Sequence, residues 1–486
     1  MYSLKDFIQN TNNAEKEVSM AHTYDELRKT YTEFIYESYT SELNDDGLKL
    51  TYHFVVPGLA EFRPTLTLPI NHELVINDPH SELAERIIFS IGLVELVSYW
   101  KIACPPNVVV KAGQLNEEQV DWWKRLYFNG LGEFFFENDI DARFNDFMNM
   151  TSAGPEVGSF SNEFELSGKN LIPIGGGKDS IVTVEHLAPL HEDNVTFGVN
   201  PTIASLDTME IAGYNEEQKF IVSRTLDQEM LRLNSENYLN GHTPFSALLA
   251  FVSYLSAYLI GAEYIVLSNE ASANAASIPG TEINHQYSKT SEFEVAFQAY
   301  TKEYFSDKIF YFSILRPFAE IAIAKSFSQY EQYFYKFRSC NRGSKKNVWC
   351  GECAKCLFIF AMLAPFVDEG ILIEIFDKNI WEDESLLELW EMLSGIVAQK
   401  PFECVGTIEE VQYAIYLVSN QYFAKGEPLP YLLNESFKAA QAGEYSELKF
   451  VDGRLVSTAR WNPLHKWHVD ERVPEKFRSL VQDIIE

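Results

Sequence analysis

Residues 171–187, LIPIGGGKDSIVTVEHL, contain residue types that could hold a phosphate group. Gly175, Gly176 and Gly177 follow an apolar run, and because they lack side chains their backbone amides can approach an anion closely. A helix predicted to begin near Asp179 would point its positive end at the same place. The spacing matches neither the G-x-x-x-x-G-K-[ST] phosphate loop nor the G-x-G-x-x-G dinucleotide motif. The segment therefore predicts an anion site of another type.

Three polar residues, Lys178, Asp179 and Ser180, follow these glycines directly. A carboxylate beside phosphates is repulsive unless a cation lies between them, and Mg²⁺ is the cation that phosphates commonly carry in proteins. The alternative is a glycine-rich strand-to-helix turn in which Asp179 only favours the helix N-terminus. The first interpretation predicts a magnesium–phosphate site.

Four of the six cysteines, Cys340, Cys350, Cys353 and Cys356, lie in the segment RSCNRGSKKNVWCGECAKCLF. In a cytoplasmic chain such clustering favours metal over disulfides, and C-x₂-C-x₂-C with a fourth cysteine upstream can close a tetrahedral zinc site. An iron–sulfur cluster and free thiols are the alternatives. Four thiolate ligands would leave no open coordination position, so we expect a structural zinc ion.

A second group of candidate residues could transfer protons. Cys404, in KPFECVG, lies outside the cysteine quartet, and it is either an acid/base, because a thiolate is poorly hydrated, or a buried structural cysteine. His285 and Lys289 lie in the polar segment SNEASANAASIPGTEINHQYSKTSEFE, where they would either transfer protons or bind anionic oxygens of a substrate. Arg316 and Arg338 could bind phosphates or pair with carboxylates.

The elements that must position these residues alternate between strands and helices after residue 168. Strands are predicted at Leu171–Ile174, Val195–Val199, Tyr264–Ser268 and Ile309–Leu315, and helices around Lys178–Leu187, Pro244–Leu259, Glu292–Phe305 and Pro317–Ser328. This alternation predicts an α/β fold with a parallel sheet covered on both faces. Since ligands collect at the carboxyl ends of such strands, the polar segment after residue 268 should hold a second substrate.

The rest of the chain adds two further parts. Residues 1–168 combine alternating strand patterns with helical ones, which predicts an α+β domain, and the chain is mostly helical from about residue 354. We therefore predict a division into 1–168, 169–335 and 336–486, with nucleotide binding in the middle part. Trp461, His465 and His468, in the tail segment STARWNPLHKWHVDERV, are expected only to pack.

Composition restricts the partners. The 486-residue chain has a formal net charge of -31 and no run of lysine and arginine, which argues against a nucleic-acid substrate but leaves small anionic ligands possible. The N-terminus lacks a basic segment followed by an apolar one, and the longest apolar run is interrupted by serines and by Gly261 and Glu263. We therefore expect a cytoplasmic protein that does not enter a membrane.

The sequence GGGKDS directly after a strand resembles the PP-loop of ATP pyrophosphatases, whose usual form is SGGxDS; here Gly175 replaces the first serine. The resemblance implies an adenine nucleotide α-hydrolase-like fold. It also implies cleavage of ATP to AMP and pyrophosphate, with AMP transferred to a substrate oxygen. The cysteine pattern and the segment LRPFAEIAIAK resemble the 7-cyano-7-deazaguanine synthases (QueC), which belong to the same group.

The polar middle segment lacks the acidic and arginine pattern of QueC. Together with GGGKDS, FRSCN, WCGECAKCLF and KPFECVG, it is similar instead to the UDP-N-acetylmuramoyl-L-alanyl-L-glutamate epimerases (MurL), from residue 171 to about 410. This resemblance implies ATP-dependent conversion of the terminal L-glutamate to D-glutamate through an acyl-adenylate, during peptidoglycan precursor synthesis. Adenylylation would cancel the carboxylate charge that otherwise makes the α-proton very weakly acidic.

Two alternatives stay open from the sequence. One is a QueC-like ligase, amidating or nitrile-forming, that acts on a deazapurine or a protein carboxylate. The other is a noncatalytic regulator that binds a nucleotide in the same glycine loop. The presence of Lys178, Asp179 and Ser180 together favours catalysis.

Overall fold

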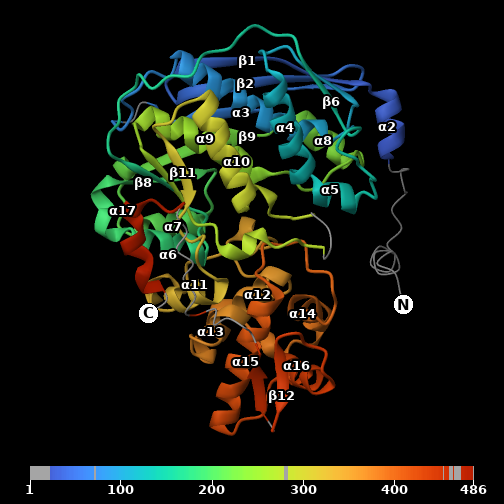
Figure 1. Cartoon of the computed structure of the whole chain (residues 1–486), viewed down its shortest axis with the longest axis vertical. Coiled ribbons are helices and arrows are strands. Elements are labelled where there is room, and N and C mark those ends of the chain that lie inside the picture. The colour runs from blue at the N-terminus through green and yellow to red at the C-terminus, as the bar shows by residue number, and fades with distance from the viewer. Residues whose placement is uncertain are drawn as a thin grey trace.

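A large mixed sheet organises the chain (Figure 1). The computed structural model describes residues 22–70, 73–278, 283–452, 454–458, 464 and 472–484. The strand order is β11-β10-β7-β8-β9-β4-β2-β1-β5-β6, and β3 pairs with β2. The strands are β1 (Glu33–Asn44), β2 (Gly47–Val56), β3 (Ala60–Phe62), β4 (Thr65–Leu68), β5 (Asn107–Val110), β6 (Asn149–Ser152), β7 (Asn170–Pro173), β8 (Asn194–Val199), β9 (Lys219–Thr225), β10 (Tyr264–Leu267) and β11 (Phe310–Ser313).

The parallel part of this sheet carries the predicted phosphate loop. Strands β7, β8 and β9 are parallel to one another, and β10 and β11 continue the parallel pairing on the other side of β7. The four predicted strands of this region are confirmed to within two residues, whereas β9 was not predicted. The chain leaves β7 for β8 on one side and returns to β10 on the other. The carboxyl end of β7 is therefore a topological switch point, where open α/β sheets bind ligands.

The N-terminal strands extend the same sheet. Strand β4 pairs antiparallel with β9, so that Thr65 lies opposite Thr225 and Thr67 opposite Ser223. The sequence did not indicate this pairing, because strand pairing between distant segments leaves no local signal. The pairing places helices from the N-terminal part close to the predicted substrate segment.

Helices cover both faces of the sheet. They are α2 (Tyr24–Thr30), α3 (Glu82–Trp100), α4 (Glu117–Gly130), α5 (Gly132–Glu137), α6 (Lys178–His186), α7 (Ile203–Ile211), α8 (Gln228–Ser235), α9 (Phe245–Ile260), α10 (Ser291–Tyr304) and α11 (Glu320–Phe327). Successive strand residues point to opposite faces, so Leu171 packs in one hydrophobic core and Ile172 in the other. Helix α11 begins three residues later than predicted, because Arg316 and Phe318 form turn hydrogen bonds first.

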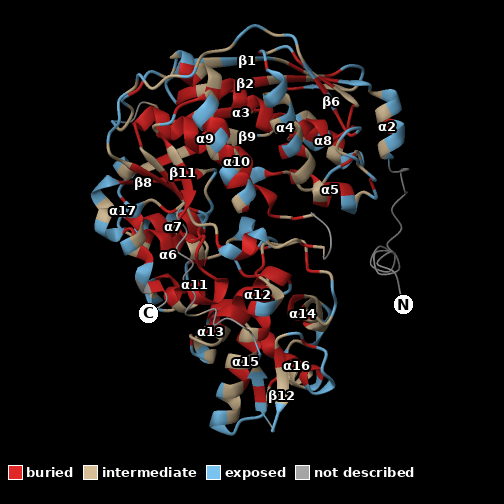
Figure 2. Cartoon of the chain, viewed as in Figure 1, coloured by how far each residue is buried: buried red, intermediate tan, exposed pale blue. Residues whose placement is uncertain are grey.

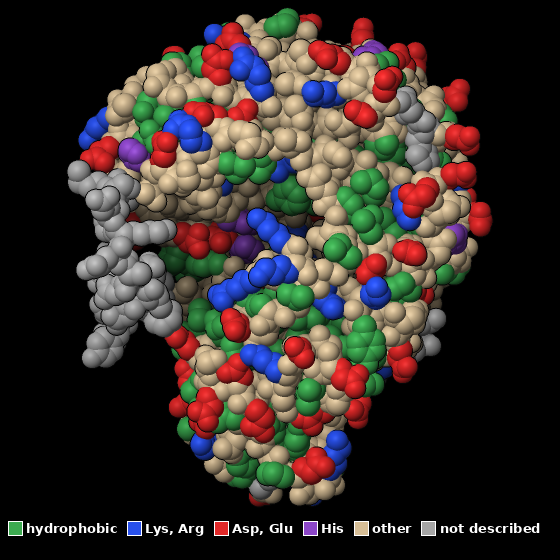
Figure 3. Space-filling model, turned by 180° about the vertical axis from the view of Figure 1, so that it is seen from behind, with side chains coloured by type: hydrophobic (Ala, Val, Ile, Leu, Met, Phe, Trp, Pro, Cys, Tyr) green, Lys and Arg blue, Asp and Glu red, His purple; other side chains and the backbone are tan. Residues whose placement is uncertain are grey.

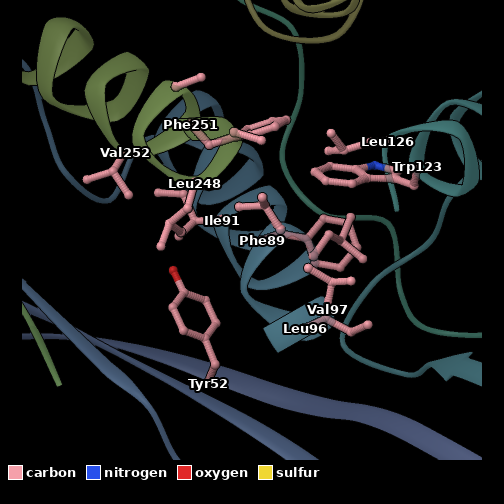
Figure 4. Close-up of a cluster of buried hydrophobic side chains, with 14 of the residues drawn as sticks. Tyr52, Phe89, Ile91, Leu96, Val97, Trp123, Leu126, Leu248, Phe251 and Val252 are labelled. Atoms are coloured by element: carbon pink, nitrogen blue, oxygen red, sulfur yellow. The ribbon is translucent and has the colours of Figure 1, made fainter. Parts of the chain in front are cut away.

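The core on the first face is rich in aromatic side chains (Figure 4). Helices α3 and α9 lie against each other there, and α3 is buried around most of its circumference (Figure 2). Trp123 of α4 stacks on Phe251 of α9 with ring centroids 5.0 Å apart. Such large buried rings supply much of the hydrophobic stabilisation that fixes α4, and with it the adjoining α5.

The C-terminal region is mostly helical, as predicted, and most of it lies below the sheet in Figure 1, whereas its last helix, Glu475–Arg478, lies beside the sheet, where Phe477 packs against Tyr264 and Phe312. Its helices are α12 (Ala354–Leu363), α13 (Glu369–Phe376), α14 (Leu387–Ser394), α15 (Ile408–Lys425), α16 (Tyr431–Ala442) and α17 (Glu475–Arg478). A hairpin of β12 (Leu448–Val451) and β13 (Arg454–Ser457), which was not predicted, interrupts them. Trp461, His465 and His468 lie outside the described residues.

No helix in the described part of the chain has both the length and the apolar character needed to cross a bilayer. The most apolar long segment, α9, ends at Gly261, whose φ of 67° is the left-handed cap that terminates many helices.

Candidate active site

The glycine loop connects β7 to α6 at the switch point. Gly176 has a φ of 78°, and a Cβ there would lie 2.6 Å from the backbone of Ala204, so only glycine fits. Ser180 Oγ accepts a hydrogen bond from the Gly176 amide at 3.1 Å and donates to the Gly177 carbonyl at 2.9 Å. Ser180 thus braces the loop. Helix α6 begins immediately after Gly177, with its N-terminus directed at the loop.

Lys178, Asp179 and Glu320 form a charged group beside the loop. The Lys178 ammonium donates to both Asp179 and Glu320, and its side chain is 1% exposed. Burial alone would lower the pKa of Lys178, but the two carboxylates raise it, so the ammonium stays charged. Burial raises the pKa of the Glu320 carboxyl to about 8 although Lys178 lowers it, so Asp179, whose pKa is lowered and whose side chain is 26% exposed, is the carboxylate that is charged at neutral pH. Carboxylate oxygens are preferred ligands of Mg²⁺, and the magnesium site at Asp179 stays a prediction.

A cavity of about 340 Å³ adjoins the loop, and apolar ligand sites of this size are common in proteins. It lies at the carboxyl ends of β7 and β8. Its lining includes Gly175, Phe197, Val199, Thr202, Arg224 and Phe245. The cavity has mostly apolar walls and one cationic side chain, which suits the nucleoside of a bound nucleotide.

The segment before the first clustered cysteine contacts the other side of the loop. The Arg338 amide donates to the Gly176 carbonyl at 2.9 Å. A Cβ on Gly177 would lie 3.3 Å from the Cβ of Ser339. Ser339 Oγ is buried and has no hydrogen-bond partner among the described residues, so it is a free hydroxyl at the loop. Arg338 itself binds the carbonyls of Phe337 and Asn347.

The four clustered cysteines converge as predicted. Their sulfur atoms all lie within 4.8 Å of one another, and the Sγ–Sγ distances are 4.0 Å for Cys340–Cys353, 3.7 Å for Cys350–Cys356 and 3.5 Å for Cys353–Cys356. Tetrahedral zinc with Zn–S bonds of about 2.3 Å requires sulfur atoms about 3.8 Å apart. The cluster could therefore bind a metal, and its geometry fits zinc. Because Cys340 follows Ser339, the metal would also fix the segment that holds the glycine loop.

Cys404, Lys289 and His285, which are distant in sequence, meet in a second cluster. Lys289 Nζ lies 3.4 Å from Cys404 Sγ, and His285 is hydrogen-bonded to the same thiol. Burial raises the pKa of the Cys404 thiol, but Lys289, the His285 hydrogen bond and Lys355 together lower it to about 6. Cys404 is therefore a thiolate at neutral pH. Its surroundings are those of a reactive cysteine, because cationic side chains lie beside the sulfur.

The segments that carry Lys289 and Cys404 are both held in place by hydrogen bonds from other side chains. Arg316 donates to the Lys289 carbonyl at 2.7 Å and forms an ion pair with Glu294 at 2.9 Å, with both side chains 2% exposed. Of the two roles open from the sequence, Arg316 therefore has the ion pair. On the other side, Lys355 in the first turn of α12 donates to the Cys404 carbonyl, and its amide binds Glu403 at 2.7 Å. The cysteine cluster therefore also anchors the Cys404 loop.

The two clusters belong to one charged region. After Lys178, the cations Lys355 and Lys289 contribute to lowering the pKa of Asp179, which burial alone would raise. Figure 3 shows a hollow between the upper body and the C-terminal helices, in which cationic, acidic and histidine side chains gather. The same two lysines, Lys289 and Lys355, therefore act on both Asp179 and Cys404.

Sequence reasoning missed two residues of this region, Glu133 in α5 and His242. The His285 Nδ1 atom is hydrogen-bonded to Glu133, and His242 Nδ1 lies 3.8 Å from the same carboxylate oxygen. The rings of His242 and His285 have centroids 4.4 Å apart. Glu133 lies in LGEFFFE and His242 in NGHTPF, and neither segment has a motif that would have indicated a role.

The fold and the site together define a class: an α/β protein with a glycine-rich loop at the sheet's switch point and a buried cysteine that shares two neighbouring lysines with Asp179 of that loop. Two family models match the chain, the MurL N-terminal domain over residues 25–314 and the MurL C-terminal domain over residues 336–446. The chain belongs to the MurL family.

Curated relatives agree with this assignment. The UDP-N-acetyl-alpha-D-muramoyl-L-alanyl-L-glutamate epimerase of Xanthomonas oryzae pv. oryzae is 34% identical over 393 residues, which cover 78% of this chain and 81% of the relative. Proteins of the same name from a Micromonospora species and from Salinispora tropica are 32% and 30% identical over 400 and 398 residues, each covering 80% of this chain and 87% and 85% of the relative.

Proposed function

We propose that this protein epimerises the terminal L-glutamate of UDP-N-acetylmuramoyl-L-alanyl-L-glutamate to D-glutamate, with ATP as the activating co-substrate. The observation that carries the proposal is the contact between the Cys404 thiolate and Lys289 in the same charged region as Asp179. One part of the region suits a nucleotide phosphate and the other suits proton transfer at carbon. The names of the three curated relatives supply the substrate.

The glycine loop would hold ATP in this reaction. We assign the triphosphate to Gly175, Gly176, Gly177 and the N-terminus of α6, and Mg²⁺ to Asp179, with Glu320 as its neighbour. Bound Mg²⁺ would neutralise phosphate charge during adenylyl transfer. Lys178, shared between the two carboxylates, would hold them in place. We also propose a PP-loop fold, which the parallel strands on both sides of β7 and the glycine loop after it support, and the division 1–168, 169–335 and 336–486.

Proton transfer would follow activation of the substrate carboxylate as an acyl-adenylate. The α-proton becomes acidic because the adjacent carboxylate charge is cancelled. We assign Cys404, His285 and Lys289 to this step, since they form the cluster next to the loop. Reprotonation of the planar carbanion on its other face and hydrolysis would give D-glutamate and AMP. Because ATP is consumed, the reaction would pass beyond an equal mixture of the two epimers.

Structural zinc completes the proposal. The four cysteines would hold it, and through Ser339 and Lys355 they connect to the glycine loop and to the Cys404 loop. The ion would therefore keep the two functional segments at their present distance.

The proposal is tested by product analysis. Purified protein is incubated with UDP-N-acetylmuramoyl-L-alanyl-L-glutamate, ATP and Mg²⁺, and the terminal glutamate is released and resolved by chirality. We expect D-glutamate, AMP and pyrophosphate in a ratio near one to one to one. AMP and pyrophosphate formation with a carboxamide or nitrile product would indicate a ligase instead, and no nucleotide turnover with any carboxylate would indicate a binding protein.

A further inference from the structure

A buried chain of contacts links the N-terminal part of the protein to the Cys404 thiol. Glu133 of α5 binds His285 Nδ1, and His285 is hydrogen-bonded in turn to Cys404. The Glu133 side chain is 9% exposed and the His285 side chain 14% exposed. With Nδ1 occupied by Glu133, Nε2 is the nitrogen left for the thiol. A carboxylate, an imidazole and a thiol therefore stand in series, as in triads that activate a nucleophile or base.

Hydrogen bonds and nearby charges favour a thiolate at Cys404 and an imidazolium at His285. Cys404 faces Lys289, His285 and Lys355, while His285 faces Cys404, Glu133 and His242. Burial disfavours the imidazolium, but hydrogen bonds to Cys404 and Glu133 raise the pKa of His285 to about 9. Burial and His285 lower the pKa of His242 to about 3, so His242 is neutral. Glu137, one turn from Glu133, is exposed but also interacts with these groups: burial and Glu133 raise the pKa of its carboxyl, and His285 lowers it.

We propose that Glu133 is the positioning residue of the catalytic centre: it holds His285 as an imidazolium whose other nitrogen faces Cys404, so that Cys404 is the proton acceptor of the resting enzyme. This inference rests on the proposed function for its chemistry, but the thiolate itself exists without substrate. In the reaction the α-proton would pass to the Cys404 sulfur, and the His285 imidazolium would compensate the charge of the thiolate until then. Helix α5 thus contributes Glu133 to a site whose other members, His285 and Cys404, lie at least 152 positions later in the chain.

A metal site is the competing interpretation. The ligand atoms of Glu133, His242 and His285 all lie within 4.8 Å of one another, which is close enough for one ion. A metal ion between His285 and Glu133 would displace the proton that joins them. Cys404 is not among these three possible ligands, whereas the hydrogen-bonded series of Glu133, His285 and Cys404 includes the thiol.

The test measures the reactivity of Cys404 in the absence of substrate. Native protein is treated with limiting iodoacetamide from pH 5 to pH 10, and the alkylation rate of the Cys404 peptide is followed by mass spectrometry. In the wild type the rate should reach half of its maximum near pH 6. In Glu133→Gln the midpoint should rise by about one pH unit, because the amide cannot hold an imidazolium. In Glu117→Gln, a control at an exposed carboxylate of the neighbouring helix α4, the midpoint should not move.

A second variant keeps the test decisive if Glu133→Gln folds poorly. His285→Asn removes the imidazolium directly, and its midpoint should rise at least as far as that of Glu133→Gln. Folded Glu133→Gln or His285→Asn with the wild-type alkylation profile would overturn the proposal. So would a metal ion, beyond that of the cysteine cluster, in wild-type protein that is lost from both Glu133→Gln and His242→Ala. Because no substrate is used, these results do not depend on the epimerase assignment.

The same variants separate positioning from substrate binding. Glu133→Gln should lower kcat for α-proton exchange by about tenfold or more with KM little changed, since Glu133 acts through His285 rather than on the substrate. The acid limb of the kcat profile should move to higher pH together with the alkylation midpoint. A raised KM with unchanged kcat would place Glu133 in substrate binding and overturn its role as a positioning residue.

Discussion

Lys289 Nζ lies 3.4 Å from Cys404 Sγ, although 115 positions separate the two residues in the chain. The contact joins the segment after β10 to the loop before α15. Burial raises the pKa of the Cys404 thiol, but Lys289, together with His285 and Lys355, lowers it to about 6. Proton transfer at the substrate α-carbon would therefore depend on the contacts that hold these two segments in place.

The rate of α-proton exchange should depend on pH with a plateau between about 6 and about 9. Burial raises the pKa of Cys404, but Lys289 and His285 lower it to about 6, so the thiolate is lost below that pH. His285 has a pKa of about 9, because its bonds to Cys404 and Glu133 outweigh burial, and the imidazolium is lost above that pH. The measurement is kcat/KM for exchange across this range. A flat profile through pH 6 would contradict the role of the thiolate.

Asp179→Asn should lower pyrophosphate release by orders of magnitude while the fold stays intact. The amide keeps the shape of the side chain but cannot neutralise Mg²⁺, so the phosphates lose their cation. Asp207→Asn, on the nearby helix α7, is a suitable control, because Asp207 pairs with Lys336 rather than with Lys178. Pyrophosphate release at the wild-type rate from Asp179→Asn would remove the nucleotide assignment of the loop.

Cys353→Ser should reduce the zinc content from about one ion per chain to almost none and should lower the melting temperature. Since the cysteine segment contacts the glycine loop through Arg338, ATP binding should weaken as well. Cys104→Ala is the matched control: Cys104 is fully buried elsewhere, so this change should cost some stability without loss of zinc. Metal-free wild-type protein of full stability would show that the cluster is only a set of thiols.

Arg316→Met should destabilise the protein by about 3–5 kcal/mol, because it leaves Glu294 buried without its partner. The double variant Arg316→Met/Glu294→Gln should recover much of that loss in urea unfolding. Both variants should show reduced thiol reactivity at Cys404, since Arg316 also holds the Lys289 carbonyl. Unchanged reactivity would mean that the Lys289 loop is fixed by other contacts.

Local signals in the sequence accounted for the parallel strands, the helix after Gly177 and the convergence of the four cysteines. These features depend on short-range periodicity, on glycine at a left-handed position and on ligand spacing. The sequence could not indicate that β4 pairs with β9 or that Glu133 meets His285, because each contact joins segments far apart in the chain. The sequence allowed Cys404, His285 and Lys289 to be assigned to one reaction, but only the fold shows that they contact one another.

The exchange of the substrate α-hydrogen with solvent tests the central claim most directly. In D₂O with ATP and Mg²⁺, UDP-N-acetylmuramoyl-L-alanyl-L-glutamate should give product that carries deuterium at the terminal α-carbon and has D configuration there. Omission of ATP should abolish the label, because the free carboxylate keeps the α-proton too weakly acidic. Cys404→Ala should still form the adenylate but exchange much more slowly. AMP and pyrophosphate produced without deuterium in the product would contradict the epimerase assignment.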